Sequence, residues 1–216
     1  MLSYNSVIFD LDGTLLNTKA GIVKSLIYVT ESLDLPSIPE SKYSFFIGPQ
    51  IEHSLRDYFQ LNEERTIEAA SAFRKVYAEQ YLFDAEPYDG ILDMLASLKS
   101  SSLKLAIATY KRHDYAGKVI EHFGLNKYCN PCLGSDPEIR TTKALIISAC
   151  MSEMNADPSR TVYVGDTEHD RLGAEKAGIS FIGVTYGFGY TRNGNGYCDT
   201  ANAISEIILG GDVCSS

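Results

Sequence analysis

A short apolar run near the start of the chain ends at two acidic residues with one residue between them. Residues 6–16 read SVIFDLDGTLL. An apolar run of this length predicts a strand buried in a parallel sheet, and Gly13 provides the break at which the chain can leave it. Because side chains alternate along a strand, we expect Asp10 and Asp12 to project to the same side. Ligands of open α/β sheets bind at such carboxyl ends, so this feature predicts a ligand site there.

Strand and helix patterns alternate along the chain after residue 87. Apolar runs predict further strands at 103–109, 132–134, 161–165 and 181–184, and helices at 88–99, 115–123, 143–154, 168–177 and 200–209. Strands separated by helices in this way form a parallel sheet with right-handed crossovers. The sequence therefore predicts an α/β fold.

Residues 17–83 show helical patterns and no convincing strand. Apolar stripes predict helices at 18–33, 51–59 and 63–82, with Thr18 as the N-cap of the first and a turn at 45–50. We expect a helical domain at 17–83, inserted into an α/β core domain made of 1–16 and 84–216.

Composition and charge limit the possible partners. The chain has 216 residues, of which 44% are hydrophobic, and a net charge of −9. This content supports a real core, and the negative charge argues against nucleic acid or an anionic membrane as the main partner. The sequence has neither an apolar run of about 20 residues nor a signal-peptide pattern, so we expect a cytoplasmic protein.

Two local motifs carry little functional signal. The five cysteines include one CxxC, Cys129 to Cys132, which lacks the second ligand pair of a zinc site and the helix-opening position of a redox site. The glycine-rich segment 187–196 lacks the lysine of a P-loop and the spacing of a dinucleotide-binding turn. We interpret it as a surface loop after the last strand.

Polar residues also follow the later predicted strands. Thr109 ends the second strand, Lys143 opens a helix, and Asp166 follows the strand at 161–165 with Asp170 four residues further on. An i, i+4 pair lies on one helical face, so the last two carboxylates can point to the same place. Each residue alone is more often a cap, a turn or a surface residue, and their occurrence in order at consecutive strand ends supports a common site.

Convergence of Asp10, Asp12, Asp166 and Asp170 would require a cation. Two carboxylates about 4 Å apart repel by about 4 kcal/mol at an effective dielectric of about 20. Oxygen ligands of this kind select Mg²⁺, which usually takes one or two carboxylates together with water and phosphate oxygens. At least one carboxylate would then remain available for chemistry.

The ordered motifs resemble those of a known superfamily. DLDGT at 10–14, Thr109, Lys143 and GDTEHD at 165–170 are similar to the four motifs of the haloacid dehalogenase-like hydrolases. With a helical insertion directly after the first motif, the chain most resembles the phosphoglycolate phosphatase-like branch. The resemblance covers nearly the whole chain. It implies a Rossmann-like core of five parallel strands, a helical cap, and Mg²⁺-dependent hydrolysis of a small phosphorylated metabolite.

The resemblance also implies roles for the motif residues. Asp10 would be the nucleophile that forms an aspartyl-phosphate, and Asp12 would protonate the leaving oxygen and then deprotonate water. Thr109 and Lys143 would bind phosphate oxygens. The expected metal set is Asp10, the backbone carbonyl of Asp12, Asp166, and Asp170, the last acting directly or through water.

Three positions depart from the usual pattern of the branch. Asn17 stands where an acid is frequent, Tyr110 replaces a small polar residue, and Ala144 replaces a proline, which leaves Lys111 as a substitute for Lys143. The candidate substrate-binding residues are Gly13, Thr14, Tyr110, Lys111, Gln50 and Arg56. Phosphoglycolate, a nucleoside monophosphate, a sugar phosphate and pyrophosphate all remain open as substrates.

Other functions on related architectures are less favoured. A phosphomutase would need acid, base and sugar-binding groups in the cap, where Lys42, His53 and Arg56 are only scattered candidates. A dehalogenase would need neither Asp12 nor a metal. A non-enzymatic receiver module is smaller, lacks the helical insertion and carries its phosphorylated aspartate on a later strand. Hydrolysis, including a 5′-nucleotidase or pyrophosphatase activity, is therefore expected.

Overall fold

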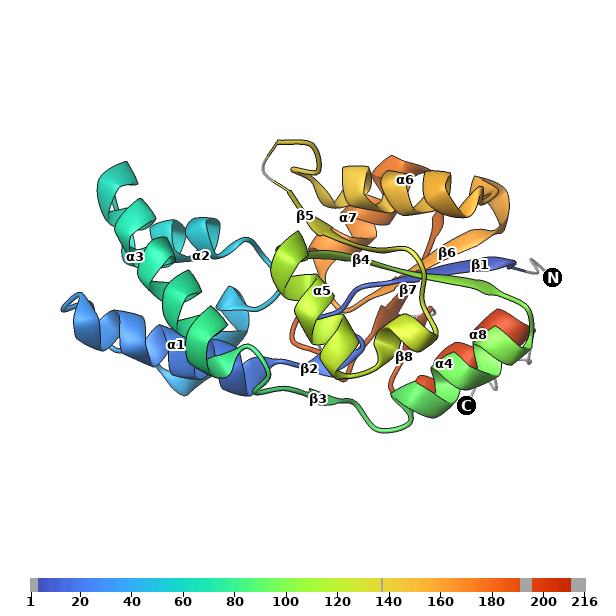
Figure 1. The fold of residues 1–216 in the computed structure, drawn as a ribbon, viewed down its shortest axis with the longest axis horizontal. Helices are drawn as coiled ribbons and strands as arrows, with labels where there is room; N and C mark the ends of the chain where they lie inside the picture. Colours follow the sequence, from blue (N-terminus) through green and yellow to red (C-terminus); the bar gives the residue numbers. More distant parts are fainter. Residues whose placement is uncertain (1–3, 137, 191–195, 211–216) are drawn as a thin grey trace.

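A layered α/β unit with a group of helices at one end makes up the structure (Figure 1). The computed structural model describes residues 4–136, 138–190 and 196–210. Helices cover both faces of the central sheet, which confirms the α/β class expected from the alternating pattern. No helix in these ranges is both long enough and apolar enough to cross a membrane.

Within the described ranges, six strands form the central sheet, in the order β5-β4-β1-β6-β7-β8, and all neighbouring pairs are parallel. The strands are β1 (Ser6–Phe9), β4 (Lys104–Arg112), β5 (Cys132–Ser135), β6 (Thr161–Gly165), β7 (Ser180–Val184) and β8 (Tyr197–Cys198). The first five are the expected ones. The two-residue β8 is an addition at the edge, too short to produce a recognisable pattern.

The central position of β1 determines where the site lies. From β1 the chain proceeds to β4 and β5 on one side, and it later returns to β6 and β7 on the other. Such a reversal opens a crevice at the carboxyl end of the first strand. All four β1 residues are buried because both faces are covered: Val7 and Phe9 join one core cluster and Ile8 joins the other.

Five helices form the two outer layers of the core among the described residues. On one face lie α4 (Ile91–Ser100), α5 (His113–His122) and α8 (Ala201–Leu209), and on the other lie α6 (Lys143–Met154) and α7 (Glu168–Ala177). Threonines cap the N-termini of α6 and α7 through their side-chain oxygens. These two helices pack on each other and begin close to the carboxyl ends of the strands.

The segment between the first strand and α4 is helical, as expected. It contains α1 (Lys19–Ser32), the short 3₁₀ helix η1 (Glu40–Phe46), α2 (Ile51–Phe59) and α3 (Glu63–Val76), followed by η2 (Tyr77–Tyr81). Two short antiparallel strands, β2 (Leu16–Asn17) and β3 (Glu86–Pro87), connect it to the rest. Figure 1 shows these helices together at one end of the molecule.

Two local expectations in this segment were wrong. Part of the predicted turn at 45–50 is the end of η1, and the predicted helix at 63–82 changes after Val76 into the π-helical turn η2. Close packing accompanies this change: a Cβ added at Gly21 of α1 would lie 2.3 Å from the carbonyl oxygen of Tyr81. Thr18 occupies the N-cap position of α1, but its side chain makes no capping hydrogen bond.

Candidate active site

A single buried lysine joins two carboxylates at the carboxyl end of the sheet. Lys143, the first residue of α6, places its Nζ 2.8 Å from Asp10 Oδ1 and 2.8 Å from Asp170 Oδ1. It also donates to the hydroxyl of Tyr163 at 3.2 Å, and that hydroxyl donates to the carbonyl oxygen of Ala108. Asp10, directly after β1, is only 2% exposed, so this ion pair is shielded from water.

Asp170 is held in place by the start of α7. Its Oδ2 accepts hydrogen bonds from the backbone N–H of Thr167 at 3.0 Å and from the Thr167 hydroxyl at 2.6 Å. Its own backbone N–H donates to Thr167 Oγ1 at 3.3 Å, which completes a capping box. Because Lys143 occupies Oδ1, both oxygens of this carboxylate already have protein partners. This arrangement suits a residue that orients its neighbours.

Asp166, directly after β6, is fully buried and is oriented by the loop after β7. Its Oδ2 accepts from the backbone N–H of Phe188 at 2.7 Å, and the hydroxyl of Thr14 lies 3.5 Å from its Oδ1. A Cβ added at Gly187 would lie 2.3 Å from the carbonyl oxygen of Gly13 and 2.5 Å from Asp166 Oδ2. Residues 187–190 form a partly exposed loop after β7, as expected, and they also contribute to the site; residues 191–195 lie outside the described ranges.

Gly13 leaves room for the same carboxylate. Its φ of +87° is in the left-handed region, and a Cβ there would lie 2.3 Å from Asp166 Oδ2. Thr109, near the carboxyl end of β4, is buried, and its hydroxyl accepts a hydrogen bond from the backbone N–H of Lys111 at 3.2 Å. Motif residues that follow β1 and β6 thus meet at one place, and Thr109 lies on β4, the strand that pairs with β1.

The clustered carboxylates have the chemistry of a divalent-cation site. Asp10, Asp166 and Asp170 offer oxygens that all lie within 4.8 Å of one another. Burial, opposed by Lys143 and reinforced by Asp170, raises the pKa of Asp10 to about 7. Burial and the neighbouring Asp170 and Asp10 carboxylates raise the pKa of Asp166 well above its ordinary value. A hard cation such as Mg²⁺ fits this donor set because it would offset the repulsion between buried acids.

A second lysine accompanies the remaining acid of the first motif. Lys111 Nζ lies 3.1 Å from Asp12 Oδ1 and donates to the hydroxyl of Tyr77, in η2, at 2.9 Å. Burial opposes the charge on Lys111, but Asp12 and Tyr77 outweigh it and raise the lysine pKa above its usual value. Lys143 therefore pairs with Asp10, and Lys111 pairs with Asp12.

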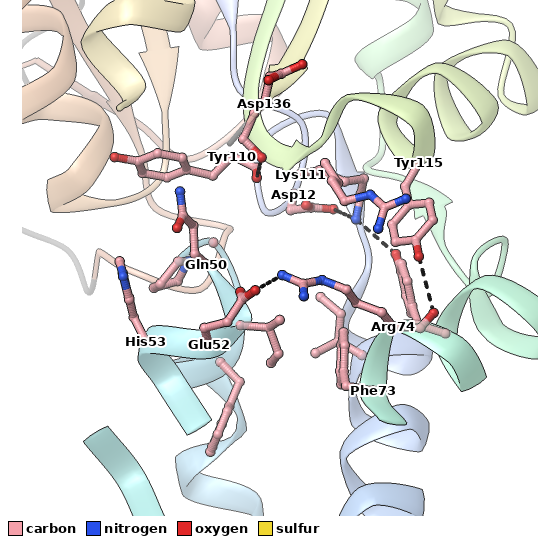
Figure 2. A pocket seen from close by; sticks show the side chains of 18 of the residues that line it. Asp12, Gln50, Glu52, His53, Phe73, Arg74, Tyr110, Lys111, Tyr115 and Asp136 are labelled. Carbon is pink, nitrogen blue, oxygen red and sulfur yellow. Dashed lines mark hydrogen bonds and ion pairs between the residues drawn. The ribbon is translucent and has the colours of Figure 1, made fainter. Parts of the chain in front are cut away.

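A cavity of about 590 Å³ separates this site from the helical segment (Figure 2). Asp12 and Lys111 line it from the strand side, and Gln50, Glu52 and Arg74 line it from the helices. Gln50 is one of the expected substrate-binding residues. Its amide also donates to the carbonyl oxygen of Thr141 at 3.5 Å.

Three of the expected substrate-binding residues, Gln50, Tyr110 and Lys111, line this cavity. Gly13 and Thr14 lie beside Asp166 instead, and Arg56 lies elsewhere. Arg56 is not among the described residues that line the cavity; its side chain is half exposed and pairs with Asp57 at 3.0 Å. Glu52 of α2 and Arg74 of α3 line the cavity from the helical side and form an ion pair with each other. Helical periodicity alone did not reveal which face of α2 and α3 would meet the core.

Known proteins are similar to this chain in both sequence and fold. Residues 7–184 match the model of the haloacid dehalogenase-like hydrolase family. The chain belongs to this family. A 5′-nucleotidase from Pseudomonas aeruginosa is 30% identical over 213 residues, which cover 96% of each chain, and a phosphoglycolate phosphatase from Caulobacter vibrioides is 27% identical over 87% of this chain and 81% of its own length.

A solved structure extends this likeness to the whole fold. The crystal structure of a predicted phosphatase from Clostridium acetobutylicum has a TM-score of 0.89 and 32% identity, and the match covers 96% of this chain and 99% of that one. The family, its phosphoglycolate phosphatase-like branch and the expected enzyme class, a phosphoric monoester hydrolase, are confirmed by these comparisons.

The contact between the loop after β7 and Asp166 can be tested with a matched pair of glycine substitutions. Gly187→Ala is expected to lower the free energy of unfolding by about 1–3 kcal/mol, because the new methyl group has no space. In Gly117→Ala, within α5, the added Cβ meets nothing within 4 Å, so stability should rise by up to about 1 kcal/mol. Urea denaturation measures both, and equal stability of the two variants would contradict the tight packing.

The raised pKa of Asp10 predicts pH-dependent cation binding. Below about pH 7 the metal-free protein holds a proton on Asp10 that Mg²⁺ must displace, whereas above it the carboxylate is free to bind. Calorimetric titration with Mg²⁺ should show weaker binding with proton release at about pH 6 and stronger binding at about pH 8. Asp10→Asn should reduce this dependence. Equal affinity at both pH values would count against the prediction.

Proposed function

We propose that the protein hydrolyses a small phosphate monoester with the help of Mg²⁺, through an aspartyl-phosphate on Asp10. The observation that carries the proposal is the buried Asp10 carboxylate at the sheet reversal, paired with Lys143 and close to two further carboxylates. A nucleophile needs access to phosphorus, and the acids around it need a cation. This combination suits phosphoryl transfer.

The reaction would proceed in two displacements at phosphorus. An Asp10 oxygen attacks phosphorus, the bond to the leaving alcohol breaks, and Asp12 donates a proton to the leaving oxygen. Water then attacks the aspartyl-phosphate, gives its proton to Asp12, and releases inorganic phosphate with Asp10 restored. Lys111, 3.1 Å from Asp12, orients the acid-base group toward the cavity that would receive the leaving alcohol.

The remaining site residues would bind and orient the phosphate. Asp10, Asp166 and the backbone carbonyl of Asp12 would hold Mg²⁺, and Asp170 would support them through Lys143. When bound, the cation neutralises charge on the phosphoryl oxygens. Thr109 and Lys143 would contact the same oxygens.

The helical segment at 17–83 would act as a cap domain over a core formed by 1–16 and 84–216. Its position next to the cavity and its attachment through β2 and β3 support this division. The hydrogen bond from Lys111 to the Tyr77 hydroxyl connects the site to the helical segment. Closure of the cap would exclude water while the leaving group departs.

Inorganic phosphate release from a panel of phosphorylated metabolites tests the proposal. Wild-type protein with Mg²⁺ should release phosphate from at least one ester, and EDTA should abolish the release. Asp10→Asn should lower kcat by at least about 10³-fold because the nucleophile is lost.

A matched substitution controls for a general effect of losing a carboxylate. Asp93→Asn changes an exposed residue of α4 on the outside of the core and should leave the rate unchanged. Release that persists both with EDTA and in Asp10→Asn would disprove the mechanism.

A further inference from the structure

The cavity shows which part of a substrate the helical segment would contact. Its inner end is formed by Asp12 and Lys111, and its outer wall comes from α2 and α3 (Figure 2). If Asp12 protonates the leaving oxygen, as the proposed function requires, the rest of the leaving alcohol must occupy this cavity. The side chains that line the cavity therefore indicate which chemical groups that alcohol carries.

Charges on the cavity wall are already balanced. Each lysine or arginine among the described residues that line it has a carboxylate partner. The pairs are Lys111 with Asp12 at 3.1 Å, Arg112 with Asp114 at 2.7 Å, and Arg74 with Glu52. A leaving group that carries a carboxylate would have to break one of these pairs to find a cation.

The Arg74–Glu52 pair is the most relevant of the three. The two side chains come from different helices and are only about one third exposed, 33% and 31%. An anion entering the cavity would meet Glu52 and also Asp136, which lies in the same lining, 3.9 Å from Arg140. Like charges in a partly desolvated site repel, so this wall disfavours an anionic leaving group such as glycolate.

The size and aromatic content of the cavity favour a larger group with a flat ring. A volume of about 590 Å³ lies within the range of roughly 300–1,000 Å³ that holds drug-sized ligands, and a two-carbon acid would leave most of it empty. Aromatic rings contribute much of the wall: Phe46, Phe73, Tyr77, Tyr110 and Tyr115. Any nucleobase can stack on such a ring, because every base presents a flat aromatic face.

One polar side chain is suitably placed to form hydrogen bonds with the edge of such a ring. The side chain of Gln50 extends toward Tyr110 in Figure 2, and both line the cavity. A glutamine amide offers both a donor and an acceptor, which matches the edge of a base. Tyr110 itself occupies a position where the family resemblance leads us to expect a small polar residue.

From these observations we propose that the substrate is a phosphate monoester of an uncharged alcohol that carries a flat ring, the chemistry of a nucleoside 5′-monophosphate. Glu52 determines this specificity because it neutralises Arg74. The assignment rests on the proposed phosphatase function and narrows its substrate class.

Phosphate release with Mg²⁺ from a purine and a pyrimidine nucleoside 5′-monophosphate, ribose 5-phosphate and phosphoglycolate tests the assignment. We expect kcat/KM for at least one nucleotide to exceed that for phosphoglycolate by about 100-fold or more. Ribose 5-phosphate, which is uncharged beyond its phosphate but lacks the flat ring, should fall at least about 10-fold below that nucleotide.

Glu52→Gln tests the role of the ion pair. Freeing Arg74 should shift the ratio of kcat/KM values toward phosphoglycolate by about 10-fold. The matched control is Glu68→Gln on α3, which removes an exposed pair with Arg65 at 2.7 Å and should leave the ratio unchanged. If Glu52→Gln does not fold, Tyr110→Ser replaces it and should lower kcat/KM for the nucleotide by about 10-fold while sparing phosphoglycolate.

The outcomes separate this assignment from the function on which it rests. Phosphoglycolate turned over as well as the nucleotides, or a ratio unchanged by Glu52→Gln, would overturn the assignment and leave the phosphatase function standing. Absence of phosphate release from every ester would overturn both.

Discussion

The buried contact of Lys143 with Asp10 and Asp170 is the interaction on which the site depends. It joins the end of β1 to the starts of α6 and α7, so one ammonium group fixes three elements around the reversal of the sheet. Removing one partner of such a buried pair typically costs about 3–5 kcal/mol, because the other charge is left without compensation. The lysine thereby allows several carboxylates to lie close together where water is excluded. One ammonium group does not balance the negative charge of all of these carboxylates, and a divalent cation would offset the remainder.

Two buried lysines pair with different acidic residues of the first motif. Lys143 serves the carboxylate proposed to attack phosphorus, and Lys111 serves the one proposed to move protons at the edge of the cavity. Because Lys111 also binds Tyr77, the proton-transfer side of the site is linked to the helical segment, whereas the nucleophile side belongs to the core alone.

The core of the site could be predicted from the sequence, and its periphery could not. Asp10, Asp166 and Lys143 follow apolar strands or open helices, and parallel strands bring such positions together whatever the details of packing. Arg74 and Glu52 were missed because the direction of a helix face in an inserted segment depends on how that segment docks. The role of Gly187 was missed because a glycine-rich loop has no periodicity, and its purpose appears only when Asp166 fills the space a side chain would take.

The covalent step on Asp10 is the central claim, and trapping it is the most direct test. The protein would be mixed with an ester that it hydrolyses, labelled at phosphorus, and the reaction would be quenched in acid within the first turnover. The protein would then be digested, and its peptides would be analysed for the label. We predict label on the peptide that contains Asp10, released alcohol that precedes free phosphate, and no label in Asp10→Asn. Label on any other residue, or simultaneous release of alcohol and phosphate without protein-bound label, would contradict the account.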